Sequence, residues 1–192
     1  MTTPSDPAAH AALPRPSAWI ARFAPLVVPQ GRVLDLACGQ GRHARLFAAR
    51  GCRVVAVDRD ATALAALGGV PGIETRALDL EAGCWPLAGE RFDAIVVVNY
   101  LHRPLLPHLV LALADDGVLL YETFAAGNEA FGRPANPNFL LLRDELLHLA
   151  AGGLSVVAFE QGRLCAPGRE AVVQRLAAVG LRRAWPPSLP GE

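Results

Sequence analysis

Hydrophobic residues in this chain fall into short apolar runs that alternate with stretches of helical periodicity. Five runs predict buried strands, at residues 33–36, 53–57, 73–78, 92–98 and 117–122. Helical stretches fall at residues 42–50, 60–68 and 104–114, and residues 17–25 predict a further helix that Ser17 caps. Strands that alternate with helices across short loops favour a parallel sheet with right-handed crossovers.

The alternation changes beyond residue 123. Residues 125–138 are polar and carry glycine and proline, which predicts a loop longer than most connections in a compact domain. A helix at residues 142–151 follows, and residues 154–161 and 170–179 then predict two strands joined across Pro167 and Gly168. The expected fold is α/β: a Rossmann-like, seven-stranded, mostly parallel, doubly wound sheet with an antiparallel strand in a C-terminal hairpin.

Length and composition favour one domain. A chain of 192 residues, 52% of them hydrophobic, can bury one substantial core. Residues 1–16 are rich in proline and small polar residues, and residues 182–192 are again rich in proline. We therefore expect a flexible leader at 1–16, a single domain at 17–181 and a flexible tail at 182–192.

Charge and cysteine content narrow the function classes. Eighteen basic residues balance eighteen acidic ones, so no strong field attracts nucleic acid or an anionic membrane. The four cysteines lack the spacing of a zinc site or a disulfide framework. No metal site is therefore expected, and the cysteine usage indicates the cytoplasm. No apolar stretch is long enough for a membrane helix. We expect a monomer or a weak homodimer.

The most informative stretch is residues 33–58, which begins with a buried strand and a turn containing Gly39 and Gly41. A helix and a second buried strand follow, and this strand ends at Asp58, 19 residues after Gly39. This is half of a nucleotide-binding βαβ unit. Glycine permits a sharp turn and close approach of a ligand, and a carboxylate at the position of Asp58 can accept both hydroxyls of a ribose.

Two cofactors compete for this turn. Gly39, Gly41 and Ala44 also satisfy the dinucleotide pattern of NAD(P)-dependent oxidoreductases. However, Asp35 lies in the strand before the turn, where its carboxylate would repel a pyrophosphate and attract an ammonium group.

At this point the sequence resembles the class I S-adenosylmethionine-dependent methyltransferases. Residues 35–41 (DLACGQG) resemble the first motif of that family, and residues 92–100 resemble its fourth-strand motif. The resemblance implies S-adenosyl-L-methionine as cofactor, with Asp58 on the ribose and Asp79 and Leu80 on the adenine. Further cofactor contacts are expected at Asp35, Cys38, Gly39, Gly41, Arg59 and Asn99.

Within that superfamily the chain looks most like small bacterial enzymes related to the tellurite-resistance and thiopurine methyltransferases. Residues 99–102 (NYLH) depart from the NPPY motif of enzymes that methylate amino groups of nucleic acids and glutamine. A small-molecule acceptor is therefore expected, and a nucleic acid is not.

The acceptor side carries no diagnostic motif, so its candidates rest on position. His102 and Tyr121 follow or end strands at the carboxyl edge of the sheet and are candidates for catalysis. Candidate substrate contacts come from the same edge and from the long loop: Arg103, Glu122, Asn128 and Arg133. A methyltransferase is the leading hypothesis; a nicotinamide-dependent oxidoreductase and a non-catalytic S-adenosylmethionine-binding regulatory module are the alternatives.

Overall fold

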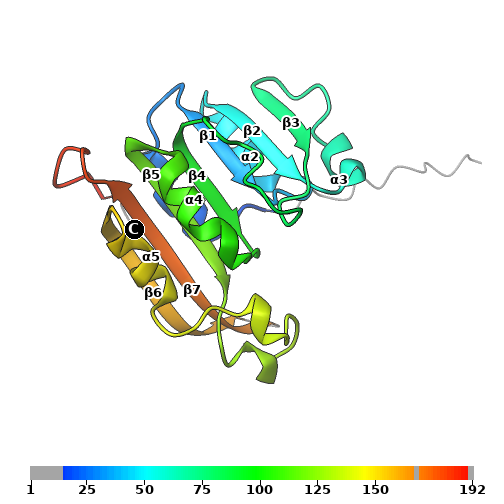
Figure 1. Cartoon of the computed structure of the whole chain (residues 1–192), viewed down its shortest axis with the longest axis vertical. Coiled ribbons are helices and arrows are strands. Elements are labelled where there is room, and N and C mark those ends of the chain that lie inside the picture. Colours follow the sequence, from blue (N-terminus) through cyan, green and yellow to red (C-terminus); the bar gives the residue numbers. More distant parts are fainter. Residues whose placement is uncertain (1–14, 167–168, 190–192) are drawn as a thin grey trace, which may run out of the picture.

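A computed structural model describes residues 15–166 and 169–189, and in these residues seven strands form one sheet in the order β3-β2-β1-β4-β5-β7-β6 (Figure 1). The strands are β1 (Arg32–Leu36), β2 (Arg53–Asp58), β3 (Ile73–Ala77), β4 (Phe92–Val98), β5 (Leu113–Phe124), β6 (Leu154–Ala166) and β7 (Arg169–Gly180). The α-helices are α1 (Ala18–Phe23), α2 (Arg42–Ala49), α3 (Ala61–Ala65), α4 (Leu106–Ala112) and α5 (Glu145–Ala151).

Strand direction confirms the predicted fold class. Strands β3, β2, β1, β4 and β5 pair in parallel, and β7 pairs antiparallel with both β5 and β6. A parallel sheet is covered on both faces, which explains the nearly continuous apolar runs of its strands. The long hairpin of β6 and β7 lies next to β5 and forms the edge of the sheet opposite β3 (Figure 1).

Two apolar cores lie on opposite faces of the sheet. Alternate residues of each strand point to opposite faces, so Val33 joins the core under α1 and α2, whereas Leu34 joins the core under α4 and α5. Helix α1 begins where Ser17 accepts a hydrogen bond from the Trp19 amide, and it buries Trp19, Ile20 and Phe23 in the first core.

Several element boundaries differ from the prediction. The helix expected at residues 104–114 is a 3₁₀ turn, η2 (Arg103–Leu105), followed by α4, and it ends earlier because Leu113 already pairs with Phe92 in the sheet. The helix expected from residue 142 begins at Glu145, after Asp144 adopts a left-handed φ of 61°. Strands β6 and β7 are both longer than expected.

The long connection after β5 contains two short 3₁₀ turns, η3 (Asn128–Ala130) and η4 (Pro137–Phe139). The turn expected at Pro167 and Gly168 and most of the leader expected at 1–16 lie outside the described residues. Part of the tail contacts the body: Arg183 donates side-chain hydrogen bonds to the carbonyls of Leu26 and Asp116. Among the described residues, no helix combines the length and apolarity needed to span a bilayer.

Candidate functional site

A cavity of about 390 Å³ lies at the carboxyl ends of the parallel strands, where open α/β sheets bind ligands. Its lining comes from the ends of β1 to β5 and from the long connection. The lining residues are Ala37, Asp58, Arg59, Leu78, Asp79, Leu80, Glu81, Asn99, Tyr100, Leu101, Thr123, Phe124, Pro134 and Phe139.

Asp58 links the glycine turn to the tip of β2. Its Oδ2 accepts a hydrogen bond from the Gly39 amide at 2.8 Å, and its Oδ1 accepts one from the Asp60 amide at 3.0 Å. Each carboxylate oxygen has a second lone pair, so Asp58 can still accept hydrogen bonds from a ligand in the cavity. The fixed carboxylate is therefore oriented by the backbone before any ligand binds.

One end of the cavity is acidic. Asp79 and Glu81 follow β3, and the Asp79 Oδ1 atom accepts the Glu81 amide at 2.9 Å. Together with Asp58 they set three carboxylates against one guanidinium, that of Arg59, among the described residues of the lining. This end favours a cationic ligand over an anionic one.

The two glycines have different structural roles. Both have positive φ, 54° at Gly39 and 73° at Gly41. A Cβ at Gly41 would lie 2.4 Å from Leu67 Cδ1, whereas a Cβ at Gly39 would meet no atom within 4 Å. Gly41 thus allows close packing against Leu67, and Gly39 leaves open space beside the turn, although neither residue lines the cavity.

Asp35 is buried at the base of the same turn, with 1% of its surface exposed. Its Oδ2 accepts the Ala44 amide of α2 at 2.8 Å. Burial raises the pKa of the Asp35 carboxyl to about 7, against the opposing effects of the Ala44 amide and the Arg42 charge. Asp35 therefore orients the start of α2 and does not itself line the cavity.

Cys38 follows in the turn and is also buried. Burial, and then the carboxylates of Asp35 and Asp58, raise the pKa of its thiol. The thiol stays protonated at neutral pH and behaves as a small packing residue.

Asn99 and Tyr100 bring the end of β4 into the cavity. Asn99 has a left-handed φ of 57°, and Ala37 at the end of β1 has one of 53°. Residues other than glycine rarely adopt this backbone conformation, and backbone strain of this kind is concentrated at ligand sites. Both residues line the cavity.

Tyr121 and His102, the candidates for catalysis, do not line the cavity. The Tyr121 hydroxyl donates to the Tyr100 carbonyl at 2.9 Å in a fully buried site, where burial raises its pKa. His102 is half-buried and precedes η2. Tyr121 therefore holds the backbone of Tyr100, a residue of the cavity lining, through this hydrogen bond.

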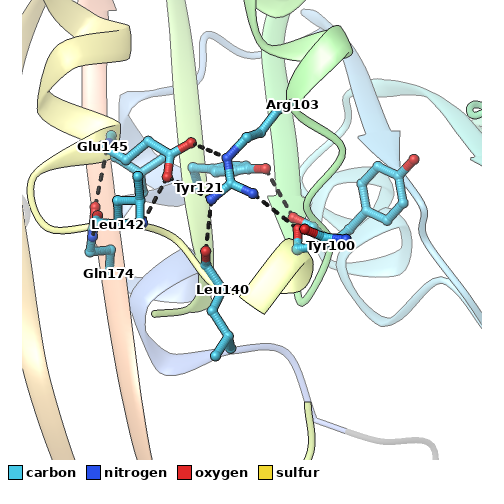
Figure 2. A network of polar contacts seen from close by, with 9 residues as sticks. Tyr100, Arg103, Tyr121, Leu140, Leu142, Glu145 and Gln174 are labelled. Carbon is cyan, nitrogen blue, oxygen red and sulfur yellow. Dashed lines mark hydrogen bonds and ion pairs between the residues drawn. The ribbon is translucent and has the colours of Figure 1, made fainter. Parts of the chain in front are cut away.

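Arg103 of η2 links the long connection to α5 through its side chain (Figure 2). Its Nε and Nη2 atoms donate to the two carboxylate oxygens of Glu145 at 2.8 and 3.0 Å. Nη1 donates to the Asn138 carbonyl at 3.1 Å and Nη2 to the Leu140 carbonyl at 2.8 Å. Arg103, a candidate substrate contact, is thus committed to structural contacts on either side of Phe139.

The remaining substrate candidates are also outside the cavity lining. Glu122 accepts the Ser17 hydroxyl at 2.8 Å and pairs with Arg175 at 3.1 Å, on the α1 face of the sheet. Asn128 is buried, donates to the Pro134 carbonyl at 3.0 Å and accepts the Val172 amide at 3.1 Å. Arg133 is exposed and immediately precedes Pro134, which does line the cavity.

His43 is buried and bonds to Ser17, the residue whose hydroxyl donates to Glu122. Its Nε2 accepts the Ser17 amide at 3.1 Å. Burial, and then the neighbouring Arg42 charge, lower the pKa of His43 to about 3. The neutral imidazole therefore anchors the start of α1.

Sequence reasoning missed the cavity residues that are apolar. Ala37 lies within the first motif but was not singled out as a contact, whereas Leu78, Leu101, Phe124, Pro134 and Phe139 carry no motif signal, and Glu81 and Thr123 look like ordinary turn and strand residues. The available signal was positional: Thr123 and Phe124 end β5 at the ligand-binding edge, and Pro134 and Phe139 lie in or next to a conspicuously long loop.

Comparison with known proteins agrees with the site geometry. Residues 33–115 match the family model of a methyltransferase domain. No curated protein matches the chain in sequence. The family match confirms the predicted resemblance to the class I S-adenosylmethionine-dependent methyltransferases over residues 33–115.

Solved structures share the fold at low identity. TehB from Haemophilus influenzae superposes with a TM-score of 0.67 at 20% identity, over 84% of this chain and 61% of that one. A TehB-like S-adenosylmethionine-dependent methyltransferase from Corynebacterium glutamicum gives 0.59 at 22% identity, over 83% and 85% of the two chains.

A third structure contains ligands. The Burkholderia thailandensis 1,6-didemethyltoxoflavin-N1-methyltransferase, with bound 1,6-didemethyltoxoflavin and S-adenosylhomocysteine, gives a TM-score of 0.60 at 23% identity. The match covers 83% of this chain and 74% of that one. This chain thus spans less than two thirds of Haemophilus TehB but more of the other two proteins.

Proposed function

We propose that this chain, a class I S-adenosylmethionine-dependent methyltransferase, transfers the sulfonium methyl group of its cofactor to a nucleophile on a small-molecule acceptor. The observation that carries the proposal is the single cavity that runs from Asp58 and Asp79 at the tips of β2 and β3 to Thr123 and Phe124 at the end of β5. Such a cavity can hold a cofactor and an acceptor side by side.

The residues at the acidic end fit the cofactor. Asp58 is oriented to accept ribose hydroxyls, and Asp79 with Leu80 borders the space for adenine. Three carboxylates against one guanidinium suit a cofactor whose sulfonium and ammonium groups outweigh its one carboxylate. Asp35 lies four residues before Gly39, and its carboxylate would attract the ammonium group of the cofactor, directly or through water.

The chain contributes orientation and the exclusion of water. When bound, the cofactor supplies a methyl group that its sulfonium sulfur has already activated. Buried residues such as Leu80, Leu101 and Thr123 keep water from the middle of the cavity. Proximity and orientation alone can lower the barrier by roughly 7 to 11 kcal/mol.

A small-molecule acceptor is supported by the size of the cavity and by the 1,6-didemethyltoxoflavin bound to the Burkholderia neighbour. The zero net charge of the chain also gives no attraction for a nucleic acid. The oxidoreductase alternative is set aside because the methyltransferase family model matches the chain.

Thermal unfolding with ligands tests this proposal. S-Adenosylhomocysteine at about 100 times its dissociation constant should stabilise the protein by roughly 2.7 kcal/mol, and NAD should not. Asp58→Asn should weaken S-adenosylhomocysteine binding about 10- to 100-fold in calorimetry, because it removes charge-assisted hydrogen bonds to the ribose.

Asp93→Asn is the matched control. Asp93 also accepts a backbone amide, that of Arg32 at 2.6 Å, but it lies at the amino end of β4, away from the cavity. The Asp93→Asn variant should bind S-adenosylhomocysteine with the same affinity as the wild type. Stabilisation by NAD alone, or equal losses of affinity in both variants, would contradict the proposal.

A further inference from the structure

The acceptor end of the cavity differs in chemistry from the cofactor end. Among the described residues, the lining from the end of β5 and from the long connection contains no charged side chain and only one hydroxyl, that of Thr123; the other residues there are Phe124, Pro134 and Phe139. If the proposed function holds, these residues surround the methyl acceptor. Their chemistry therefore limits what the acceptor can be.

From this lining we infer that the acceptor is an uncharged, planar nitrogen heterocycle methylated on a pyridine-type ring nitrogen. Phe124 and Phe139 line this end, and Tyr100, whose hydroxyl lies 3.5 Å from Glu81 Oε1, lines the same cavity. Aromatic side chains bind flat rings by offset or edge-to-face contacts in addition to simple burial of area.

Charge excludes anionic acceptors. A carboxylate or phosphate in this end would lose water without gaining a cationic partner, which is costly. It would also lie in the same cavity as Asp58, Asp79 and Glu81, which repel it. An uncharged acceptor has neither cost.

The absence of a titratable lining residue at this end selects the nucleophile. Among the described residues of the acceptor end, no side chain can remove a proton near neutral pH, since Tyr121 and His102 lie outside the lining. A pyridine-type nitrogen needs no base: its lone pair forms the new N–C bond, and the S–C bond breaks with its electrons going to sulfur. The positive charge passes from sulfonium to ring nitrogen and no proton moves.

The product charge also suits the lining. An N-methylated ring is a cation, and aromatic faces attract cations more strongly when water is excluded. The three carboxylates of the same cavity add a longer-range attraction to the developing positive charge. Thr123, whose side chain is buried at the end of β5, can orient a polar substituent of the ring.

Phe139 is the side chain that best tests the inference. It is 48% exposed, so its replacement should not unfold the protein, and it lines the cavity. Arg103 donates to the carbonyls of Asn138 and Leu140, the residues on either side of Phe139, so the backbone at Phe139 is held from both sides. Phe131 is a matched control: it is 37% exposed in the same connection, but it packs under Arg163 and does not line the cavity.

The experiment compares two isosteric probes, isoquinoline-5-carboxamide and isoquinoline-5-carboxylate, on the full chain saturated with S-adenosylhomocysteine. Calorimetry should show binding of the carboxamide, and binding of the carboxylate at least about tenfold weaker. With methyl-labelled S-adenosylmethionine, the carboxamide should yield a ring N-methyl product by mass spectrometry.

Phe139→Ser should weaken carboxamide binding roughly two- to tenfold, the size of one aromatic contact, and leave S-adenosylhomocysteine binding unchanged. Phe131→Ser should change neither. Equal or tighter binding of the carboxylate, no ring N-methylation, or equal effects of the two variants would overturn the inference. Failure of the proposed cofactor site is distinguishable, because S-adenosylhomocysteine itself would then not bind.

Discussion

Asp35 is a buried carboxyl that orients the start of α2 at the base of the glycine turn. Its Oδ2 is occupied by the Ala44 amide at 2.8 Å, and its pKa is raised to about 7 chiefly by burial. An ammonium group near this carboxyl favours the charged form and would lower the pKa again. Binding of such a ligand must therefore depend on pH around neutrality.

We predict that S-adenosylhomocysteine binds more weakly as the pH falls below about 7, because Asp35 must lose its proton to attract the ammonium group. The loss should approach tenfold per pH unit between about pH 7 and about pH 5. Calorimetry across this range measures it, and Asp35→Asn should show a much flatter profile. Methylthioadenosine, which lacks the amino acid part, is the matched ligand and should bind independently of Asp35 protonation.

The raised pKa of Asp35 makes folding stability change with pH in the opposite direction to cofactor binding. Unliganded protein should lose stability as the pH rises from about 4 through about 7, because folding keeps Asp35 protonated when the unfolded chain would ionise it. A pH profile of S-adenosylhomocysteine binding that is identical in wild type and Asp35→Asn would remove Asp35 from the cofactor site.

How well single residues can be predicted depends on whether backbone geometry or packing places them. The positions of Asp58 and Asp79 follow from strand ends, and the structure brings both to the cavity. Arg103 and Asn128 also had suggestive positions, but their polar atoms bond to backbone groups of the long connection. Spacing in sequence does not reveal which polar groups are already satisfied, and it gives no signal for an apolar wall residue such as Phe139.

At the scale of elements, the connection between β5 and α5 is ordered by a few side chains. Arg103 reaches it from η2, and Glu145 accepts both the guanidinium and the Leu142 amide at 2.7 Å (Figure 2). Gln174 of β7 accepts the Leu146 amide at 3.1 Å and donates to the Leu142 carbonyl. These contacts explain why α5 begins at Glu145 and not at residue 142, since the Leu142 amide and carbonyl are bound by the side chains of Glu145 and Gln174.

We predict that Arg103→Met destabilises the protein by about 1 to 2 kcal/mol, because Glu145 and two loop carbonyls lose a charged partner in a partly buried site. The variant should also raise the KM for the acceptor more than it lowers kcat, since Phe139 loses its support. Arg103→Lys should recover part of both losses. Urea denaturation and steady-state kinetics measure the two effects.

Arg91→Met serves as the control for the loss of an arginine. Arg91 likewise pairs with a carboxylate, Asp115 at 2.7 Å, and with a carbonyl, that of Leu111 at 2.9 Å, but in an exposed site away from the cavity. It should change stability by less than about 1 kcal/mol and leave KM unchanged. An acceptor KM in Arg103→Met equal to that of the wild type would show that the network does not position the cavity wall.

On the scale of the whole molecule, contacts join segments that the methyltransferase family match at residues 33–115 does not cover. The Trp19 indole donates to the Leu176 carbonyl at 3.3 Å, and Ser17 donates to Glu122 at 2.8 Å. Residues 118–124 of β5 pair along their whole length with β7. The predicted domain of residues 17–181 thus has its first helix packed on its last strand.

We therefore predict that these residues unfold as one cooperative unit. Trp85→Phe with Trp185→Phe leaves Trp19 as the only tryptophan of three, in a core site with 4% of its surface exposed. Urea unfolding followed by Trp19 fluorescence should coincide with unfolding followed by far-ultraviolet circular dichroism, as two-state behaviour requires. If Trp19 fluorescence changed at lower urea than the circular dichroism signal, α1 would detach from β7 before the sheet unfolds, and the domain would begin after residue 26.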